Sequence, residues 1–317
     1  MTTTERRLGA SDLVVSPVGL GCNNFGRPGT ATETLGGTRA VLDAAIERGV
    51  TFLDTAELYG DPAGRSEELM GQALEGRRDQ VVIATKFGHK SGGADGIESS
   101  GAPGSEAYIT KAVEGSLRRL RTDHIDLYQL HTPDEATPIG DTLQALSRLV
   151  EAGKVRYLGH SNLSADQVRE ADAVATELGL PRFVSAQNEY SLVHRDPEAE
   201  LLPTCLELGL GFLPFFPLKS GLLTGKYTRE GGKGRLENRP EVLENADWEQ
   251  LDAYQQFCEA AGLTMTEATF AWLLAQPAVS SVIAGATTPE QVHQNADAGM
   301  ARLDSFQVEV VSELFAV

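Results

Sequence analysis

The chain has 317 residues, of which 41% are hydrophobic, so one large α/β domain or two small ones can each bury a core. The formal net charge is −18, from 45 acidic and 27 basic residues. A surface this negative repels nucleic acid and anionic membranes, so we expect neither as a partner.

The N-terminus and the cysteines indicate the compartment. MTTTERRLGASDLVV is polar and has no apolar h-region, so it does not resemble a secretory signal. No run of roughly 18 apolar residues suggests a membrane-spanning helix. Cys22, Cys205 and Cys258 are odd in number, far apart and without a metal-like spacing. We expect a reduced, cytoplasmic protein without a metal site.

Eight short apolar runs, each followed by a helical pattern, are the candidate strands. They are Val18–Gly21, Val50–Asp54, Val81–Lys86, Ile125–His131, Val155–Ser161, Phe183–Asn188, Phe212–Phe216 and Ser281–Ala284. Runs such as VVIATK are almost wholly apolar, which is typical of strands buried on both faces of a parallel sheet.

Six amphipathic segments between these strands read as helices. The first, TETLGGTRAVLDAAIERG, has Thr32 or Thr34 as its N-cap and ends at Gly49, a favourable residue just beyond a helix. The others are SEELMGQALEG, YITKAVEGSLRRL, IGDTLQALSRLVEAGK, SADQVREADAVATELG and PEAELLPTCLELG. Strands and helices that alternate over eight strands predict a closed (β/α)8 barrel.

A doubly wound open sheet is the alternative architecture. It is disfavoured because no G-x-G-x-x-G follows the first strand: Gly19, Gly21 and Gly26 have the wrong spacing. The composition also does not shift along the chain, so we expect a single domain over residues 1–317.

The alternation of strands and helices is interrupted in three places. The segment before the first strand is expected to form a hairpin that seals the bottom of the barrel. HKSGGADGIESSGAPGS follows the third strand, and a long insertion runs from Leu218 to about Asn245. Both follow the C-terminal ends of strands, where barrel enzymes keep their active sites, so they are candidate substrate and cofactor loops. The alternative for the first is a flexible surface loop.

Three polar residues end consecutive strands and therefore face the same barrel mouth. They are Asp54 of FLDTAELYG, Lys86 of VVIATK and His131 of DLYQLH. Tyr59 lies in the loop after Asp54 and can fold back over that mouth. Singly, these residues read as a helix cap, a surface charge or a turn residue; their order makes a catalytic group the better interpretation.

The four side chains suit proton transfer. A free tyrosine has a pKa near ~10, and a nearby lysine ammonium favours the tyrosinate and lowers that pKa. Asp54 would keep Lys86 charged and fixed in position. His131 would orient a substrate oxygen or share in the proton transfer.

Over nearly its whole length the sequence resembles the aldo-keto reductase superfamily. The matching segments are LDTAELYG, the lysine of ATKFG, DLYQLHTPD, GKVRYLGHSN, QNEYS, PLKSGLLTGKY and GATTPEQVHQN. Because of GLLTGKY, the chain is more similar to bacterial aldo-keto reductases and potassium-channel β-subunits than to aldose reductases.

The resemblance implies a nicotinamide dinucleotide lying across the barrel mouth, with NADP(H) preferred and NAD(H) as the alternative. By motif position, Ser161, Asn162 and Gln187 hold the carboxamide, since Asn and Gln supply both donors and acceptors. The alternative for Asn162 is a cap for the helix near Ser164. Phe215 stacks on the nicotinamide ring. Phe216 stands where relatives carry a small residue, so it either belongs to the core or narrows the cofactor channel.

The remaining cofactor residues follow from the same resemblance. The loop Leu218–Leu222 receives the pyrophosphate on its backbone N–H groups. Lys226 and Arg235 contact the adenosine phosphate and favour NADPH, because a 2′-phosphate without a cation binds weakly. The full set assigned to the cofactor also contains Gly21, Cys22, Asn23, Pro217, Leu218, Ser220, Gly221, Leu222, Gly285, Thr287, Gln291 and Asn295.

The implied activity is the reversible reduction of an aldehyde or ketone to an alcohol, with Tyr59 as general acid and base. Asn24 and Phe25 are expected to line the substrate pocket. A cofactor-sensing binding protein with little turnover is one alternative. A metal-dependent hydrolase is another, but it needs several converging ligands, and the six histidines are scattered.

Overall fold

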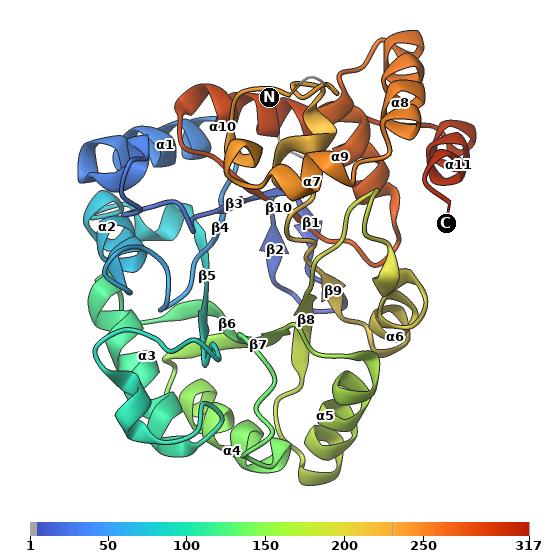
Figure 1. Ribbon diagram of the computed structural model, residues 1–317. Coiled ribbons are helices and arrows are strands. Elements are labelled where there is room, and N and C mark those ends of the chain that lie inside the picture. The colour runs from blue at the N-terminus through green and yellow to red at the C-terminus, as the bar shows by residue number, and fades with distance from the viewer. Residues whose placement is uncertain (1–4, 230, 317) are drawn as a thin grey trace.

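Eight parallel strands form one curved sheet in the described part of the chain, which is residues 5–229 and 231–316 of a computed structural model. The strands are β3 (Val18–Gly21), β4 (Phe52–Asp54), β5 (Val82–Phe87), β6 (Ile125–Leu130), β7 (Val155–Ser161), β8 (Phe183–Gln187), β9 (Gly211–Phe212) and β10 (Val282–Gly285). Their order in the sheet is β10-β3-β4-β5-β6-β7-β8-β9, and helices surround them on the outside (Figure 1). The predicted (β/α)8 barrel is confirmed.

Backbone hydrogen bonds close the barrel between β9 and the segment that leads into β10. Phe212 donates its N–H to the carbonyl of Ala278 at 2.8 Å and accepts from Ser280 at 2.9 Å. Ile283 donates to the carbonyl of Pro214 at 3.0 Å. The chain beyond β9 therefore lies against β10, although the regular strand is shorter than the predicted Phe212–Phe216.

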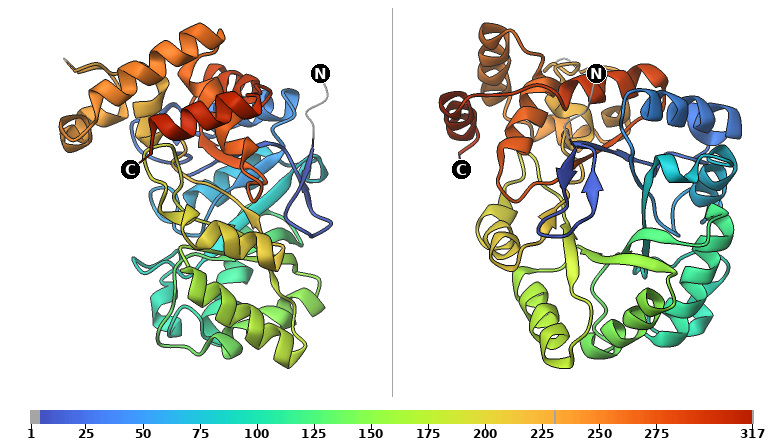
Figure 2. Two further views of the ribbon diagram at one scale, coloured as in Figure 1. Left: turned by 90° about the vertical axis from the view of Figure 1, so that its right-hand side faces the viewer. Right: turned by 180° about the vertical axis from the view of Figure 1, so that it is seen from behind.

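A two-stranded hairpin covers the N-terminal end of the barrel, as the sequence predicts. Its antiparallel strands are β1 (Arg6–Arg7) and β2 (Val14–Val15). Leu8 and Leu13 are buried in a cluster with residues of the barrel interior. Those barrel residues include Phe52, Ala84, Leu127, Leu213 and Ile283. The hairpin lies across the centre of the ring in the right-hand view of Figure 2, which shows the barrel from behind.

The predicted helices are present with small shifts at their ends. They are α1 (Leu35–Glu47), α2 (Arg65–Ala73), α3 (Glu106–Leu120), α4 (Ile139–Glu151), α5 (Ala165–Leu178) and α6 (Leu201–Leu208). Four further helices follow in the last third of the chain: α8 (Trp248–Ala261), α9 (Met265–Ala275), α10 (Pro289–Ala298) and α11 (Ser305–Leu314). Thr34 caps α1, accepting the Gly37 N–H, and Gly49 beyond the helix has a φ of +71°.

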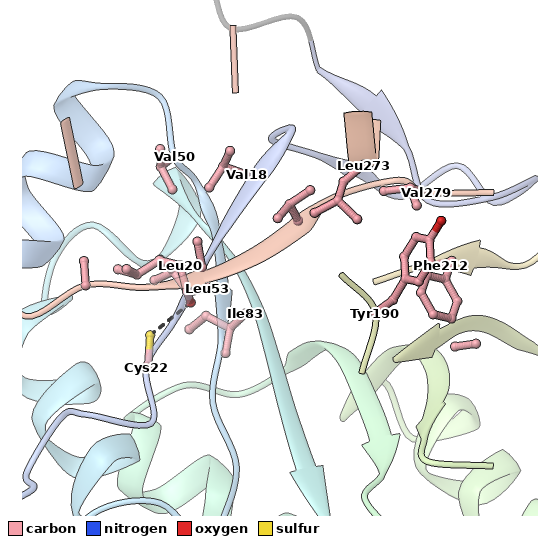
Figure 3. Packing of buried hydrophobic residues seen from close by; sticks show 14 of the residues in the cluster. Val18, Leu20, Cys22, Val50, Leu53, Ile83, Tyr190, Phe212, Leu273 and Val279 are labelled. Atoms are coloured by element: carbon pink, nitrogen blue, oxygen red, sulfur yellow. Dashed lines mark hydrogen bonds between the residues drawn. The ribbon is translucent and has the colours of Figure 1, made fainter. Parts of the chain in front are cut away.

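The hydrophobic core lies between the outer face of the strands and the helices. Figure 3 shows Val18, Leu20 and Leu53 of two adjacent strands packed side by side, with Cys22 beside them. The Cys22 thiol donates a hydrogen bond to the carbonyl of Leu20 at 3.4 Å. Among the described residues, no helix is both long and apolar enough to cross a membrane.

Both long loops lie where the sequence places them. The loop 88–105 contains a short 3-10 helix, η3 (Ile97–Ser100), and buries Ala94 and Ile97. The N–H of Gly104 donates to Asp134 at 2.7 Å. The loop is thus fastened to the barrel rather than lying loose on its surface. The second insertion contains η5 (Lys219–Thr224), η6 (Arg235–Asn238) and α7 (Pro240–Glu244).

Candidate active site

Asp54 and Lys86 form a buried ion pair at the C-terminal ends of β4 and β5. The Lys86 ammonium lies 2.7 Å from Asp54 Oδ2 and donates to the carbonyl of Thr55 at 2.9 Å. The side chains are 1% and 4% exposed. Parallel pairing of the two strands brings their ends to the same edge of the sheet. The structure therefore joins two residues that the sequence separates by a whole helix.

The second carboxylate oxygen of Asp54 is held by two amides. Gln187 Nε2 donates to Oδ1 at 2.9 Å from β8, and Gln129 Nε2 donates at 3.3 Å from β6. Gln129 was not predicted. The sequence does contain a pattern that indicates it, because Gln129 precedes His131 by two residues and so points to the same face of the strand. The sequence predicts that Gln187 holds the cofactor carboxamide. In the structure, its side-chain amide donates to Asp54.

Tyr59 and His131 lie beside this ion pair. The Tyr59 ring centroid is 5.1 Å from Lys86 Nζ. The rings of Tyr59 and His131 meet edge to face, with centroids 5.8 Å apart. Tyr59 is half-buried, whereas His131 is buried. All four predicted catalytic residues thus converge at one end of the barrel.

Burial and charge set the protonation of the group. Burial raises the pKa of Tyr59 above 10.0, and the opposing effect of Lys86 only partly offsets it. The predicted net decrease in the pKa of Tyr59 is therefore wrong: Lys86 lowers this pKa as predicted, but burial raises it by more. Burial by itself would lower the pKa of Lys86, but Asp54 and Tyr59 raise it overall. Burial, Lys86 and His89 lower the pKa of His131 well below 6.5, so its imidazole is neutral at pH 7.

Ser161 ends β7, and Asn162 follows it next to His131. The Ser161 hydroxyl donates to the carbonyl of Gln187 at 2.7 Å. Asn162 is exposed, has a φ of +62°, and donates its amide to the carbonyl of His131 at 2.9 Å. The cap of α5 is Ser164, whose hydroxyl accepts the N–H of Gln167. The alternative that Asn162 caps this helix is wrong.

Phe215 and Phe216 follow β9 at the same end of the barrel. Their rings meet edge to face at 5.3 Å. Phe216 is 37% exposed and has a φ of +52°, so it is not a core residue. Lys219, Ser220 and Gly221 also have positive φ values of +44°, +57° and +99°. Residues other than glycine rarely adopt a positive φ, and this conformation persists where the surrounding structure enforces it.

The predicted phosphate-side residues lie along this loop. Lys226 is exposed, and its ammonium lies over the Tyr227 ring at 5.0 Å. A Cβ placed on Gly221 would come within 3.0 Å of Lys226 Nζ, so the lysine packs directly on the predicted pyrophosphate loop. Arg235 begins η6, but its side chain lies outside the described part of the structure.

The predicted adenosine-side residues gather at the start of α10. Gln291 Oε1 accepts hydrogen bonds from the Thr287 backbone at 2.8 Å and from its hydroxyl at 3.1 Å. Asn295 donates to the carbonyl of Gly285 at 3.5 Å. Gly285 pairs with Gly21 of β3, so two separately predicted glycines are neighbours in the sheet.

Most of the residues after β3 that the sequence assigns to the cofactor and substrate sites are buried. Cys22 is fully buried, and Asn23 is partly exposed. Asn24 is 3% exposed, and its carbonyl accepts from the Thr32 hydroxyl at 3.0 Å. Phe25 is 0% exposed and belongs to the hydrophobic core. Both proposed substrate residues are thus buried in the wall of the barrel.

His160 precedes Ser161 in β7. It is fully buried and meets Phe183 edge to face at 5.3 Å. Burial lowers its pKa to about 3. Its neighbour Gly159 faces the side chain of Ser185, inside the barrel, so His160 points to the opposite, helix-covered face. It is a packing residue.

Comparison with known proteins covers nearly the whole chain. The model described as "Aldo/keto reductase family" matches residues 17–315. The chain is 39% identical over 299 residues to "Uncharacterized oxidoreductase YqkF" of Bacillus subtilis (strain 168), covering 94% of this chain and 92% of the relative. It is 34% identical to "Probable voltage-gated potassium channel subunit beta" of Oryza sativa subsp. japonica, covering 98% and 95%. It is also 34% identical to "Probable aldo-keto reductase 1" of Glycine max, covering 97% and 87%.

Proposed function

The chain belongs to the aldo/keto reductase family and is an oxidoreductase, and from this premise we propose that it reversibly reduces an aldehyde or ketone to an alcohol. The proposed step is direct hydride transfer to the carbonyl carbon, with Tyr59 delivering the proton to the carbonyl oxygen. The observation that carries this proposal is the buried Asp54–Lys86 pair, 2.7 Å apart, facing Tyr59 and His131.

Each side chain has a role that follows from its protonation. Tyr59 keeps its proton at neutral pH because burial raises its pKa, so the donor is in the required form. The Lys86 ammonium stabilises the tyrosinate that remains after the transfer, and Asp54 keeps that ammonium charged. Neutral His131 would hydrogen-bond the substrate oxygen without competing as a stronger acid.

The hydride would come from a reduced nicotinamide dinucleotide when it is bound. Asn162 is exposed and donates its amide to the carbonyl of His131, which suits a carboxamide site beside the catalytic group. Phe215 is partly exposed and donates its N–H to the carbonyl of Asn188, the residue after Gln187, so it is the proposed partner of the nicotinamide ring. The left-handed backbone of residues 219–221 and the ammonium of Lys226 fit a phosphate. NADP(H) is the favoured cofactor because Lys226 supplies a cation, with NAD(H) as the alternative.

The substrate partner in this proposal is a small carbonyl compound or alcohol, and the location is the cytoplasm. The three cysteines, Cys22, Cys205 and Cys258, are all free and buried, which suits a reducing compartment.

Tyr59→Phe tests the catalytic assignment. The variant keeps the ring and its contacts but has no proton to deliver, so kcat should fall by roughly 10²–10⁴-fold. The measurement is NADPH oxidation across a panel of aldehydes and ketones, with NADPH affinity followed by fluorescence. Binding should stay within roughly twofold of wild type. Turnover close to that of wild type would show that Tyr59 is not the proton donor.

A cofactor-sensing binding protein is the second candidate, favoured by the similarity to a potassium channel β-subunit. It predicts tight NADPH binding with negligible turnover on every carbonyl tested in either direction. Turnover that is lost in Tyr59→Phe would favour the reductase instead.

A further inference from the structure

The backbone N–H and the backbone carbonyl of Gly88 are each held by a side chain from another loop. Its N–H donates to Glu57 Oε1 at 2.9 Å, and its carbonyl accepts from the Thr132 hydroxyl at 2.9 Å. We call this three-residue arrangement, Glu57, Gly88 and Thr132, the Gly88 bridge. Gly88 has a φ of +77°, and a Cβ there would lie 3.0 Å from Pro103. Only glycine fits this position without strain.

The Gly88 bridge joins the three segments that carry the catalytic group. Glu57 precedes Tyr59 by two residues, Gly88 follows Lys86 by two, and Thr132 follows His131 directly. Backbone bonds reinforce the connection, since Glu57 donates its N–H to the carbonyl of Lys86 at 3.0 Å.

The Gly88 bridge also fixes a second imidazole. His89 is the residue after Gly88, and its ring meets that of His131 edge to face at 4.6 Å. His89 Nδ1 accepts the N–H of Ser91 at 3.1 Å, which leaves its proton on Nε2. A displacement of Gly88 would therefore move His89 against His131.

Glu57 is an unusual residue for this place because its carboxylate is buried among other ionisable groups. It is 1% exposed, and the same Oε1 atom accepts the Tyr108 hydroxyl at 2.8 Å. Glu67 of α2 and Arg119 of α3 face it and form their own pair at 2.7 Å. A Cβ on Gly93 would lie 2.9 Å from Glu57. The remaining neighbours are Tyr128 of β6, whose pKa is raised by burial and then by Glu57, and Asp95 and Glu98, which interact with Arg119 and Tyr108.

We propose that Glu57 is a positioning residue, and that its ionised carboxylate holds the Gly88 bridge and so sets the placement of Tyr59, Lys86 and His131 for the reaction. This inference rests on the proposed function. Two donors converge on one oxygen of Glu57, and hydrogen bonds to a carboxylate are stronger than those to a neutral acid. Protonation of Glu57 therefore weakens the Gly88 bridge.

The ionisation of Glu57 falls within the working range of pH. Burial raises its pKa to about 7, against the lowering effects of Gly88, Tyr108 and Arg119. The pKa values of three other groups at the site shift away from 7. Burial and Lys86 lower the pKa of His131, burial and Lys90 lower that of His89, and burial raises that of Tyr59. The bridge should be tight above pH 7 and loosen as the pH falls through 7.

The first measurement reads the bridge without turnover. In protein labelled with 15N-glycine, the Gly88 amide proton should shift with a midpoint near pH 7, because its acceptor changes charge. In Glu57→Gln the midpoint should disappear. In Tyr108→Phe the carboxylate loses a donor that lowers its pKa, so the midpoint should move to higher pH.

The second measurement is the pH profile of kcat/KM for carbonyl reduction. Wild type should lose activity as pH falls through 7, with the midpoint of the Gly88 amide. Glu57→Gln should lack this titration and be slower by roughly tenfold or more at pH 8, because misplaced groups react slowly. A titration of the cofactor or the substrate would appear in the profiles of both wild type and Glu57→Gln. It is thereby distinguished from the titration of Glu57.

The outcomes separate the two proposals. Matching midpoints that vanish in Glu57→Gln and move together in Tyr108→Phe support the positioning role. Identical kcat/KM profiles in wild type and Glu57→Gln would overturn it, leaving a merely structural carboxylate. A Gly88 amide without a titration near pH 7 would overturn the bridge itself. A titrating amide in a wild type that reduces no carbonyl would overturn the proposed function and leave the bridge in place.

Discussion

Lys86 carries a charge inside the barrel, and its surroundings explain how. Moving an ammonium group out of water costs several kcal/mol, so an isolated buried lysine would lose its proton. Asp54 opposes this at 2.7 Å, and two glutamine amides hold the other Asp54 oxygen. Such a pair adds little net stability compared with apolar packing. Its value is electrostatic, since it keeps a cation beside Tyr59.

A buried neutral imidazole makes stability depend on pH. Burial lowers the pKa of His160 from 6.5 to about 3 in the folded protein, and neither ring nitrogen has a hydrogen-bond partner among the described residues. The unfolded chain binds a proton below pH 6.5, whereas the folded chain does not until about pH 3. The neutral imidazole therefore carries no stability penalty above pH 6.5, and the free energy of unfolding decreases as the pH falls below 6.5. The decrease amounts to about 2 kcal/mol between pH 7 and pH 5.

We predict that His160→Leu reduces this dependence. Urea unfolding at pH 7 and pH 5 should show a smaller drop in the free energy of unfolding, by about 2 kcal/mol, than in wild type. Comparing the drops cancels the repacking effect, which is common to both pH values. An equal drop in both proteins would mean that the imidazole is solvated or paired in solution.

At the residue scale, the sequence predicted which polar side chains meet but not what surrounds them. Strand ends are readable, so Asp54, Lys86 and His131 were found. Gln129 was missed because an interior glutamine in an apolar strand resembles a packing residue. The pKa of Tyr59 was predicted with the wrong sign because burial, which dominates it, is a property of the folded chain. Glu57 was missed because its partners lie on other loops.

At the element scale, the strands and helices were predictable where hydrophobic periodicity is strong. β3 and β7 have the predicted bounds, and all of β3 and the last four residues of β7 are buried. β9 is shorter than predicted, since the chain after it makes only scattered bridges, such as that of Phe215 with Glu189. The left-handed run at residues 219–221 was not predictable, because Lys and Ser do not favour positive φ.

Two residues just before α5, Asn162 and Ser164, should have separable effects. Ser164 caps the helix, so Ser164→Ala should lower the free energy of unfolding by about 1 kcal/mol and leave NADPH affinity unchanged. Asn162→Gly keeps the left-handed backbone but removes the amide at the predicted carboxamide site. It should weaken NADPH binding by roughly tenfold, equivalent to one lost hydrogen bond.

Chemical unfolding and cofactor titration of the two variants provide the measurement, and each variant is the control for the other. Weakened binding in Ser164→Ala without a change in Asn162→Gly would contradict the cofactor assignment of Asn162.

At the scale of the whole molecule, closure of the barrel explains why residues predicted at the ends of separate strands lie together. The hairpin fills one end with Leu8 and Leu13, so the opposite end is left for the loops. Every strand then delivers its C-terminal residue to one mouth (Figure 1). Eight alternating units were enough to predict this arrangement, because parallel strands with right-handed crossovers admit few topologies.

The net charge of −18 raises a question about the proposed cofactor, because NADPH is itself an anion and carries a phosphate that NADH lacks. The Debye length is about 30 Å at 0.01 M salt and about 8 Å at 0.15 M. At low salt the whole negative surface repels the ligand, and it repels NADPH more than NADH. At physiological salt only nearby charges act, and Lys226 on the Gly221 loop is one of these.

We therefore predict that the preference for NADPH over NADH increases as salt is raised from 0.01 M to 0.15 M. Fluorescence titration with both cofactors at both salt concentrations measures it. Lys226→Gln should lose most of the preference at 0.15 M, whereas Lys90→Gln, which removes the same charge from the other loop, should keep it. Equal or tighter NADH binding at 0.15 M would overturn the assignment to NADP(H). A preference that falls with salt would mean that local cations outweigh the net charge even at long range.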